Sequence, residues 1–207
     1  IEVAKGLSTA AVISKNRVVF GIGAGWLQEE FEILGQPFEG RGRRMDEQIP
    51  IVQKLLRGEV VSADGEFYKF APLRLNPVPT QTVPFWIGGM NAAALRRAAQ
   101  YGHGWTGAGT SFDETVAILK DLHARRKAFG RDQEPFDCCI PLTEPLPADK
   151  MKQLIDLGMT GTVSWPLSFQ MPPGATMQQK KDKLRQLGDT MIAPVNATVS
   201  HLQHIID

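Results

Sequence analysis

Short, almost wholly apolar runs alternate along this chain with longer amphipathic segments, and this alternation limits the fold more than any other feature. Strands that are buried on both faces are continuously apolar, whereas helices of a globular domain keep their apolar residues on one stripe. The runs that fit buried strands are 17–23, 84–88, 104–107, 136–143 and 160–165. Strands that alternate with helices form parallel βαβ units. The pattern therefore predicts an α/β fold, either an open doubly wound sheet or a (β/α)8 barrel.

The segments between these strands carry the start and stop signals of helices. Ser111 and Glu114 fit a capping box before a helix over residues 111–129, and Gly130 supplies its end. Three further helices are expected to start after residues that cap or open helices, namely Asn91, Pro147 and Thr176.

Two stretches in the first half of the chain depart from the simple alternation. Residues 41–57 carry an apolar stripe typical of a helix, and Pro50 is expected to bend or restart that helix because it removes a hydrogen bond. Residues 58–84 hold four prolines and a polar turn at 63–65. We expect this second stretch to be an excursion outside the main sheet.

The length of 207 residues bears on the choice between the two folds. A complete eight-unit barrel typically takes about 250 residues, so five units and one excursion fit this chain but eight units do not. If the fold is a barrel, about three further strand-helix units are expected before Ile1.

The charge and composition exclude several classes of protein. The formal net charge is +1, which gives no general attraction for nucleic acid or for an anionic membrane. No apolar run approaches the roughly 20 residues of a membrane span, and the first residues lack the pattern of a signal peptide. We therefore expect a cytoplasmic protein. The four histidines and two cysteines do not have the spacing of a metal site, so none is predicted.

A glycine-rich turn, GIGAGW, ends the first predicted strand. Parallel sheets and barrels place their ligand loops after strands of this kind. The dinucleotide fingerprint would need a glycine at position 26, where this chain has Trp26. Taken alone, Gly23 and Gly25 fit a tight turn as well as they fit a ligand loop, but the indole of Trp26 favours a flat ligand.

A second motif, WIGGMN, leads from a strand into the start of a helix. Unpaired backbone amides and the positive end of the helix dipole favour an anion there, and Gly88 and Gly89 would let a phosphate approach the backbone. Met90 and Asn91 complete the motif. It lacks the lysine of a nucleotide-binding P-loop, and the alternative without a ligand is an asparagine-capped helix behind a glycine turn.

Tryptophans stand near these turns. Trp105 and Trp165 are expected near strand ends, and together with Trp26 and Trp86 they are all the tryptophans of the chain. Aromatic residues at such positions pack in the core or at its rim more often than they bind a ligand. Their coincidence with both glycine turns is what favours the ligand.

Three segments, RVVFGIGAGW, EEFEILGQPFEGRGRRMDE and PFWIGGMNAAALRRAAQYGHGWTG, together resemble the bacterial-luciferase-like superfamily. The likeness is to the branch that uses the deazaflavin coenzyme F-420, and it extends from Ile1 to about Pro194. It implies a (β/α)8 barrel with insertions, of which this chain would hold about the last five strand-helix units. Residues 1–194 would be the C-terminal part of a single barrel domain, with 58–84 outside the barrel and 195–207 as a tail.

The resemblance also implies a cofactor site. Gly88, Gly89, Met90 and Asn91 would hold the cofactor phosphate, Gly23 and Gly25 would line the ring system next to Trp26, and Trp105 would lie close to the cofactor tail. No catalytic residue is predicted, because in this family the cofactor-facing and proton-donating residues lie mostly on the first strands and loops.

The chemistry implied is hydride transfer between ring carbon 5 of a reduced deazaflavin and a small organic substrate with an activated double bond or carbonyl. The alternative in the same family is a monooxygenase that uses reduced FMN to activate oxygen. An alternative from another class is a relative that binds a cofactor or is only structural. We further expect a homodimer.

Overall fold

The computed structural model describes residues 1–163 and 171–198. Its contacts divide the chain into two compact units, one of residues 1–106 with 124–136 and the other of residues 107–123 with 137–207. In the described part of the chain, no helix is long and apolar enough to cross a membrane. That residues 1–194 belong to one barrel domain stays a prediction, and residues 199–207 of the predicted tail lie outside the described residues.

The first unit begins with a helix and then combines a parallel sheet, a hairpin and further helices. In chain order its elements are α1 (Glu2–Ile13), β1 (Phe20–Ile22), α2 (Gln28–Ile33), α3 (Arg41–Leu56), β2 (Val61–Asp64), β3 (Lys69–Leu73), β4 (Phe85–Gly88), α4 (Ala92–Tyr101) and β5 (Gly104–Thr106).

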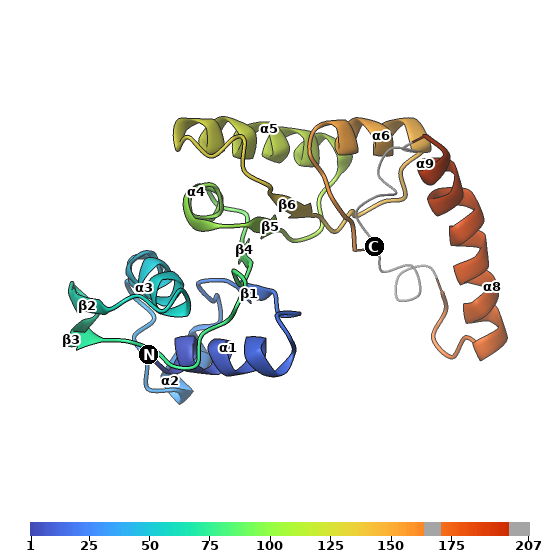
Figure 1. The fold of residues 1–207 in the computed structure, drawn as a ribbon. Coiled ribbons are helices and arrows are strands. Elements are labelled where there is room, and N and C mark those ends of the chain that lie inside the picture. The colour runs from blue at the N-terminus through green and yellow to red at the C-terminus, as the bar shows by residue number, and fades with distance from the viewer. Residues whose placement is uncertain (164–170, 199–207) are drawn as a thin grey trace. The chain divides into compact units, whose positions relative to one another are not determined.

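The sheet of the first unit contains β1, β4 and β5, with β4 in the middle (Figure 1). Both pairs of strands are parallel, with Ile22 opposite Ile87 and Ile87 opposite Trp105. Phe85, Ile87 and Trp105 are almost fully buried, as expected for strands covered on both faces. The strands predicted over 17–23, 84–88 and 104–107 are therefore present, although each is shorter than its apolar run.

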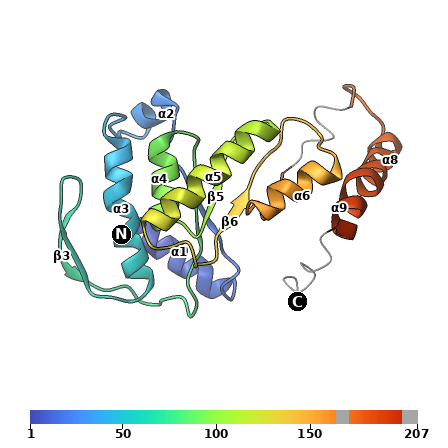
Figure 2. The ribbon, with the colours of Figure 1, turned by 90° about the horizontal axis from the view of Figure 1, so that it is seen from above.

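Helix α3 packs against α1 and α4, and α4 packs against β4 (Figures 1 and 2). The apolar stripe of α3 is buried in the core of the unit and consists of Met45, Ile49, Val52, Leu55 and Leu56. Pro50 lies inside this helix, which runs without a break from Arg41 to Leu56. The expected restart at the proline is therefore wrong, because burial of the stripe holds the helix together across it.

Two carboxylates on α3 attach neighbouring elements to this helix. Asp46 accepts hydrogen bonds from Arg96 and Arg97 of α4, each at 2.7 Å. Glu47 accepts the backbone N–H groups of Phe67 and Tyr68, both at 2.9 Å. The second contact fixes the turn between β2 and β3, which form a separate antiparallel two-stranded sheet within residues 58–84.

The second unit is mostly helical. It contains β6 (Asp137–Cys139), α6 (Ala148–Asp156), α8 (Met177–Leu187), a π-helical turn (Gly188–Ile192) and α9 (Ala193–Thr198). It also contains the first part of α5 (Phe112–Ala128), a helix that the unit boundary divides.

Local capping signals account for the helix starts in this unit. The Ser111 backbone N–H donates to Glu114 Oε2 at 2.8 Å, and the Glu114 N–H donates to the Ser111 hydroxyl oxygen at 3.4 Å, as the predicted capping box requires. Thr176 forms a second capping box with Gln179 at the start of α8. Pro147 precedes α6 as expected.

The last predicted strand is not formed as expected. Within the described residues 160–163, only Gly161 pairs with a neighbour, in a single parallel bridge to Cys139. Residues 164 and 165, including the predicted strand-end Trp165, lie outside the described residues. The predicted strand 136–143 is also short, because its ladder is limited to β6 and an isolated bridge between Leu142 and Thr110.

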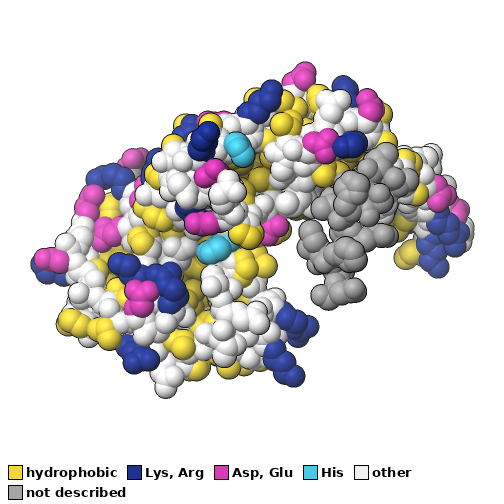
Figure 3. Space-filling view, turned by 45° about the horizontal axis from the view of Figure 1, so that its top comes forward, with side chains coloured by type: hydrophobic (Ala, Val, Ile, Leu, Met, Phe, Trp, Pro, Cys, Tyr) yellow, Lys and Arg dark blue, Asp and Glu magenta, His cyan; other side chains and the backbone are white. Residues whose placement is uncertain are grey.

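Charges of both signs are mixed over the face drawn in Figure 3, where basic and acidic side chains alternate with apolar ones. Several of these surface charges pair with each other, among them Arg43 with Glu66 and Lys69 with Asp64. This mixing agrees with the net charge of +1.

Candidate functional site

The parallel strands of the first unit bring both glycine turns to one edge of the sheet. Parallel strands end at the same edge, and the register places Gly88 of β4 opposite Thr106 of β5. On its other side, Gly88 adjoins the end of β1, since a Cβ at this glycine would lie 3.4 Å from the Ile22 carbonyl oxygen. The segments that begin at Gly23 and Gly89 therefore leave the sheet as neighbours.

The turn at residues 88–91 requires glycine at its centre. Gly89 has a φ of +123°, and a Cβ there would lie only 2.8 Å from the Ala94 Cβ. An ordinary side chain would thus be strained by the backbone and by the helix that follows. The chain can make this sharp entry into α4 only with a glycine at this position.

Asn91 caps α4, as the sequence predicts. Its Oδ1 accepts the Ala94 N–H at 2.9 Å. The amides of Ala92 and Ala93 have no acceptor within the part of the chain that the structure describes. Residues 89–93 are exposed, so these amides and the positive end of the ten-residue helix are open to an anion.

Trp105 supports this turn from inside the molecule. Its side chain is fully buried, and its indole Nε1–H donates to the Gly89 carbonyl at 2.8 Å. The Gly89 N–H in turn donates to the Thr106 carbonyl at 3.3 Å. That Trp105 lies close to the cofactor tail, as the resemblance implies, stays a prediction; in the structure its polar atom binds the turn. This hydrogen bond has no local sequence signal, because Trp105 is on β5 and Gly89 lies in the turn after β4.

The other turn, after β1, is held from α3. Gly25 has a φ of +81°, and a Cβ there would lie 2.7 Å from the Phe31 ring. The Gly25 carbonyl accepts the Arg41 Nε–H at 3.1 Å, and the Arg41 guanidinium lies 3.6 Å from the centre of the Phe38 ring. The sequence analysis did not identify Arg41 as a contact of this turn, because nothing local to Arg41 in the sequence signals a bond to Gly25.

Two residues of this turn remain open to solvent. Trp26 is 82% exposed, which is unusual for so large an apolar side chain. A Cβ at Gly23 would meet nothing within 4 Å. The turn after β1 thus has an exposed indole and an open glycine, and the neighbouring strand β4 leads to a helix start with open amides, a combination suited to a ligand with a flat ring and a phosphate.

The described residues contain no group of three histidine, cysteine, aspartate or glutamate side chains that could hold a metal ion. Met90 is 39% exposed and lies directly before the capping residue. The features that the structure brings together are thus backbone amides, glycines and aromatic rings. Groups of this kind are suited to binding and orienting a ligand, and they supply no acid or base.

The fold defines a protein of the parallel α/β class, whose two glycine turns lie at the carboxyl ends of its strands, where proteins of this class place their ligand loops. The sequence profile described as luciferase-like monooxygenase matches residues 1–157, and the chain belongs to this family.

Among the relatives, an uncharacterised protein of Mycobacterium tuberculosis is 34% identical over 195 residues, which is 93% of this chain and 67% of that protein. The 5,10-methylenetetrahydromethanopterin reductase of Archaeoglobus fulgidus is 31% identical over 134 residues, 65% of this chain and 40% of that enzyme. The FMNH(2)-dependent dimethylsulfone monooxygenase of Pseudomonas putida is 28% identical over 132 residues, 61% of this chain and 36% of that enzyme.

A similar solved structure is the coenzyme F420 dependent tetrahydromethanopterin reductase of Methanopyrus kandleri. The TM-score is 0.69 at 15% identity, and the likeness covers 92% of this chain and 78% of that one. At this identity the likeness concerns the fold alone. It agrees with the predicted α/β fold of the luciferase-like barrel type.

Proposed function

We propose that this protein is an oxidoreductase that binds reduced coenzyme F-420 and transfers a hydride to a small organic substrate. Membership of the luciferase-like family supports the class of reaction, and the similar structure of the Methanopyrus reductase, which is named as coenzyme F420 dependent, is what suggests the deazaflavin. The observation that carries the proposal is the exposed turn at residues 88–91, which leads into the start of α4 beside the end of β1.

In this proposal the cofactor phosphate binds at Gly88, Gly89, Met90 and Asn91. The fit rests on the amides of Ala92 and Ala93, which have no acceptor among the described residues, and on the lack of a side chain at Gly88 and Gly89. Trp105 serves as a positioning residue, since its indole holds the Gly89 carbonyl.

The ring system is proposed to lie against Gly23, Gly25 and Trp26. The bond between Arg41 and Gly25 would keep this turn in place while the exposed indole covers one face of the ring. The deazaflavin supplies a hydride at ring carbon 5. The residues of this chain would orient the ring toward the substrate and keep water away from it, which are the contributions expected of a protein in hydride transfer.

A second candidate is a monooxygenase that uses reduced FMN, and the Pseudomonas relative favours it. FMN also carries a flat ring and a phosphate, so the same turns would suit it. A cofactor-binding relative without catalysis is the remaining alternative, and the absence of turnover with either cofactor would identify it.

We propose that the partner is a small molecule and that the protein forms a homodimer.

The phosphate position is tested by the variant Asn91→Asp. Aspartate caps helices as well as asparagine does, so α4 should be retained. The new carboxylate would repel a bound phosphate, and loss of one charge-assisted hydrogen bond should weaken cofactor binding about tenfold. The measurements are the dissociation constant of coenzyme F-420 and the melting temperature.

Thr176→Asp is the matched control, because Thr176 caps α8 in the same way and lies outside the proposed site. It should leave the dissociation constant unchanged. If Asn91→Asp melts normally and binds the cofactor as tightly as the parent, the phosphate does not bind at this turn.

A further inference from the structure

A cavity of about 450 Å³ lies at the other end of β4, where the strand begins. Phe85, the first residue of β4, forms part of its floor together with Leu56 and Val83, and all three are buried. Its rim includes residues 80–82, which are exposed. The volume is within the usual range for small-molecule sites, roughly 300–1,000 Å³, and the apolar floor with a polar rim is typical of such sites.

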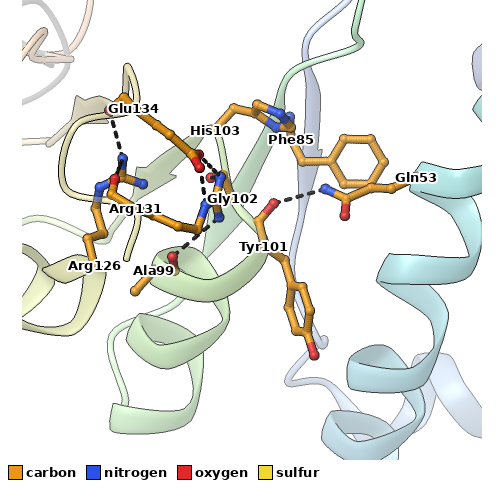
Figure 4. Close-up of polar contacts among 9 residues, drawn as sticks. All are labelled: Gln53, Phe85, Ala99, Tyr101, Gly102, His103, Arg126, Arg131 and Glu134. Atoms are coloured by element: carbon orange, nitrogen blue, oxygen red, sulfur yellow. Dashed lines mark hydrogen bonds and ion pairs between the residues drawn. The ribbon is translucent and has the colours of Figure 1, made fainter. Parts of the chain in front are cut away.

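His103 lines this cavity and offers it a hydrogen-bond donor. Its Nδ1 accepts the Phe85 N–H at 3.1 Å, and its ring lies beside the Phe85 ring (Figure 4). In a neutral imidazole with Nδ1 as acceptor, the proton is on Nε2. Within the described part of the chain, Nε2 has no partner.

The charges around His103 are mostly positive. Arg131 lines the cavity and is held at the end of α4, donating to the Gly102 carbonyl at 3.0 Å and pairing with Glu134 at 2.7 Å (Figure 4). Arg57 also lines it, and among the described residues its guanidinium is engaged only at Nε, which donates to Glu59 at 2.7 Å.

The pKa of His103 is lowered chiefly by burial, and then by the charges of Arg131, Arg126 and Arg57 against the opposing Glu134. The imidazole is therefore neutral near pH 7, and its surroundings favour an anion over a cation. The same cavity thus has an apolar floor, the imidazole N–H of His103 and positively charged arginine side chains in its lining.

We propose that this cavity is a second ligand site, for a small organic carboxylate with an apolar body. The carboxylate would accept the His103 Nε2–H within the field of Arg57 and Arg131, and the apolar body would lie on Phe85. The site is separate from the Gly88–Asn91 turn, because the two lie at opposite ends of β4. It does not depend on the proposed cofactor function.

A bound carboxylate should favour the imidazolium and so raise the pKa of His103. His103 then has a higher pKa in the complex than in the free protein. The affinity for the carboxylate should therefore rise as the pH falls from above the pKa of the complex toward the pKa of the free protein. The charged groups that bear on this imidazole are Arg57, Arg126, Arg131 and Glu134.

The test is a titration of the protein with benzoate, followed by the NMR signals of the histidine rings. His123 is exposed on α5 and serves as the internal control. We expect saturable movement of the His103 signal alone, with a raised pKa in the complex. Acetate, which lacks the apolar body, should bind more weakly. No saturable change at His103, an equal change at His123, or equal affinity for acetate would overturn the proposal.

Substitutions at Gln81, an exposed residue at the rim of the cavity, test whether the positive charge of the cavity favours the carboxylate, and they leave the core undisturbed. Gln81→Glu should weaken benzoate binding about twofold to fivefold, and Gln81→Lys should strengthen it by a similar factor. The same pair of changes at Gln36, which is exposed and does not line the cavity, should have no effect. Changes in the same direction for both Gln81 variants would contradict a charge effect and overturn the proposal.

Discussion

At the scale of single residues, Trp105 shows how the core and the candidate site are connected. Its ring is fully buried among the strands, and its one polar atom binds the Gly89 carbonyl at the edge of the sheet. A buried indole N–H needs such a partner, because leaving it unpaired would cost about 1–3 kcal/mol. The core residue therefore also fixes the turn at which the phosphate is proposed to bind.

His103 gives a prediction about the pH dependence of stability. Its pKa in the folded protein lies below the ordinary value, mainly because of burial. The unfolded chain therefore binds a proton more readily than the folded chain as the pH falls below about 6.5. The contribution of a neutral His103 is fully present above that pH and is lost as the pH falls toward the pKa of the folded form.

The measurement is the free energy of unfolding in urea at about pH 7.5 and about pH 5.5. We expect the parent to lose more stability between these two values than His103→Gln, whose amide does not titrate. His123→Gln removes an exposed histidine and should behave as the parent. Equal losses in the parent and in His103→Gln would show that burial does not depress this pKa.

At the scale of helices and strands, the pair of arginines on Asp46 joins α3 to α4. Arg97 is 6% exposed, so its charge depends on this one carboxylate. Asp46→Asn should leave a buried guanidinium without a counter-charge and lower the free energy of unfolding by about 2–3 kcal/mol. Urea unfolding measures the loss.

Asp64→Asn is the control, since both side chains of the ion pair between Asp64 and Lys69 are exposed. Exposed pairs contribute at most about 1 kcal/mol, so this variant should be nearly as stable as the parent. If the two variants lose the same amount, the connection between α3 and α4 does not rest on Asp46.

The helix starts could be predicted from the sequence because capping uses residues three positions apart. Ser111 with Glu114, and Asn91 with the Ala94 amide, bind as their spacing indicates. The strands were harder to delimit. Their length depends on which partner lies alongside, and the apolar run at 136–143 pairs as a strand only over Asp137–Cys139.

The candidate site, like the helix starts, could be predicted only where its signal is local in the sequence. Glycines at 88 and 89 signal a sharp turn, and Gly89 has the positive φ that such a turn requires. The contacts that hold both turns were not predictable, because they join residues far apart in the chain. Trp105 reaches Gly89 from another strand, and Arg41 reaches Gly25 from α3.

At the scale of the whole molecule, the matched profile and the parallel sheet place the chain in one family, but they leave two cofactors in competition. Both carry a flat ring and a phosphate, and relatives of this chain use either coenzyme F-420 or reduced FMN, as their names state. The choice therefore depends on the ring, since the phosphate turn would accept both.

We expect the protein to bind coenzyme F-420 more tightly than FMN and to consume no oxygen during turnover. Each cofactor is titrated while tryptophan fluorescence is followed, because a flat ring beside Trp26 should quench its emission. In Trp26→Phe most of the quenching should disappear, while Trp105 stays buried in the core. Tighter binding of FMN together with oxygen consumption would reverse the ranking and make the protein a monooxygenase. Quenching that persists in Trp26→Phe would place the ring away from the turn after β1.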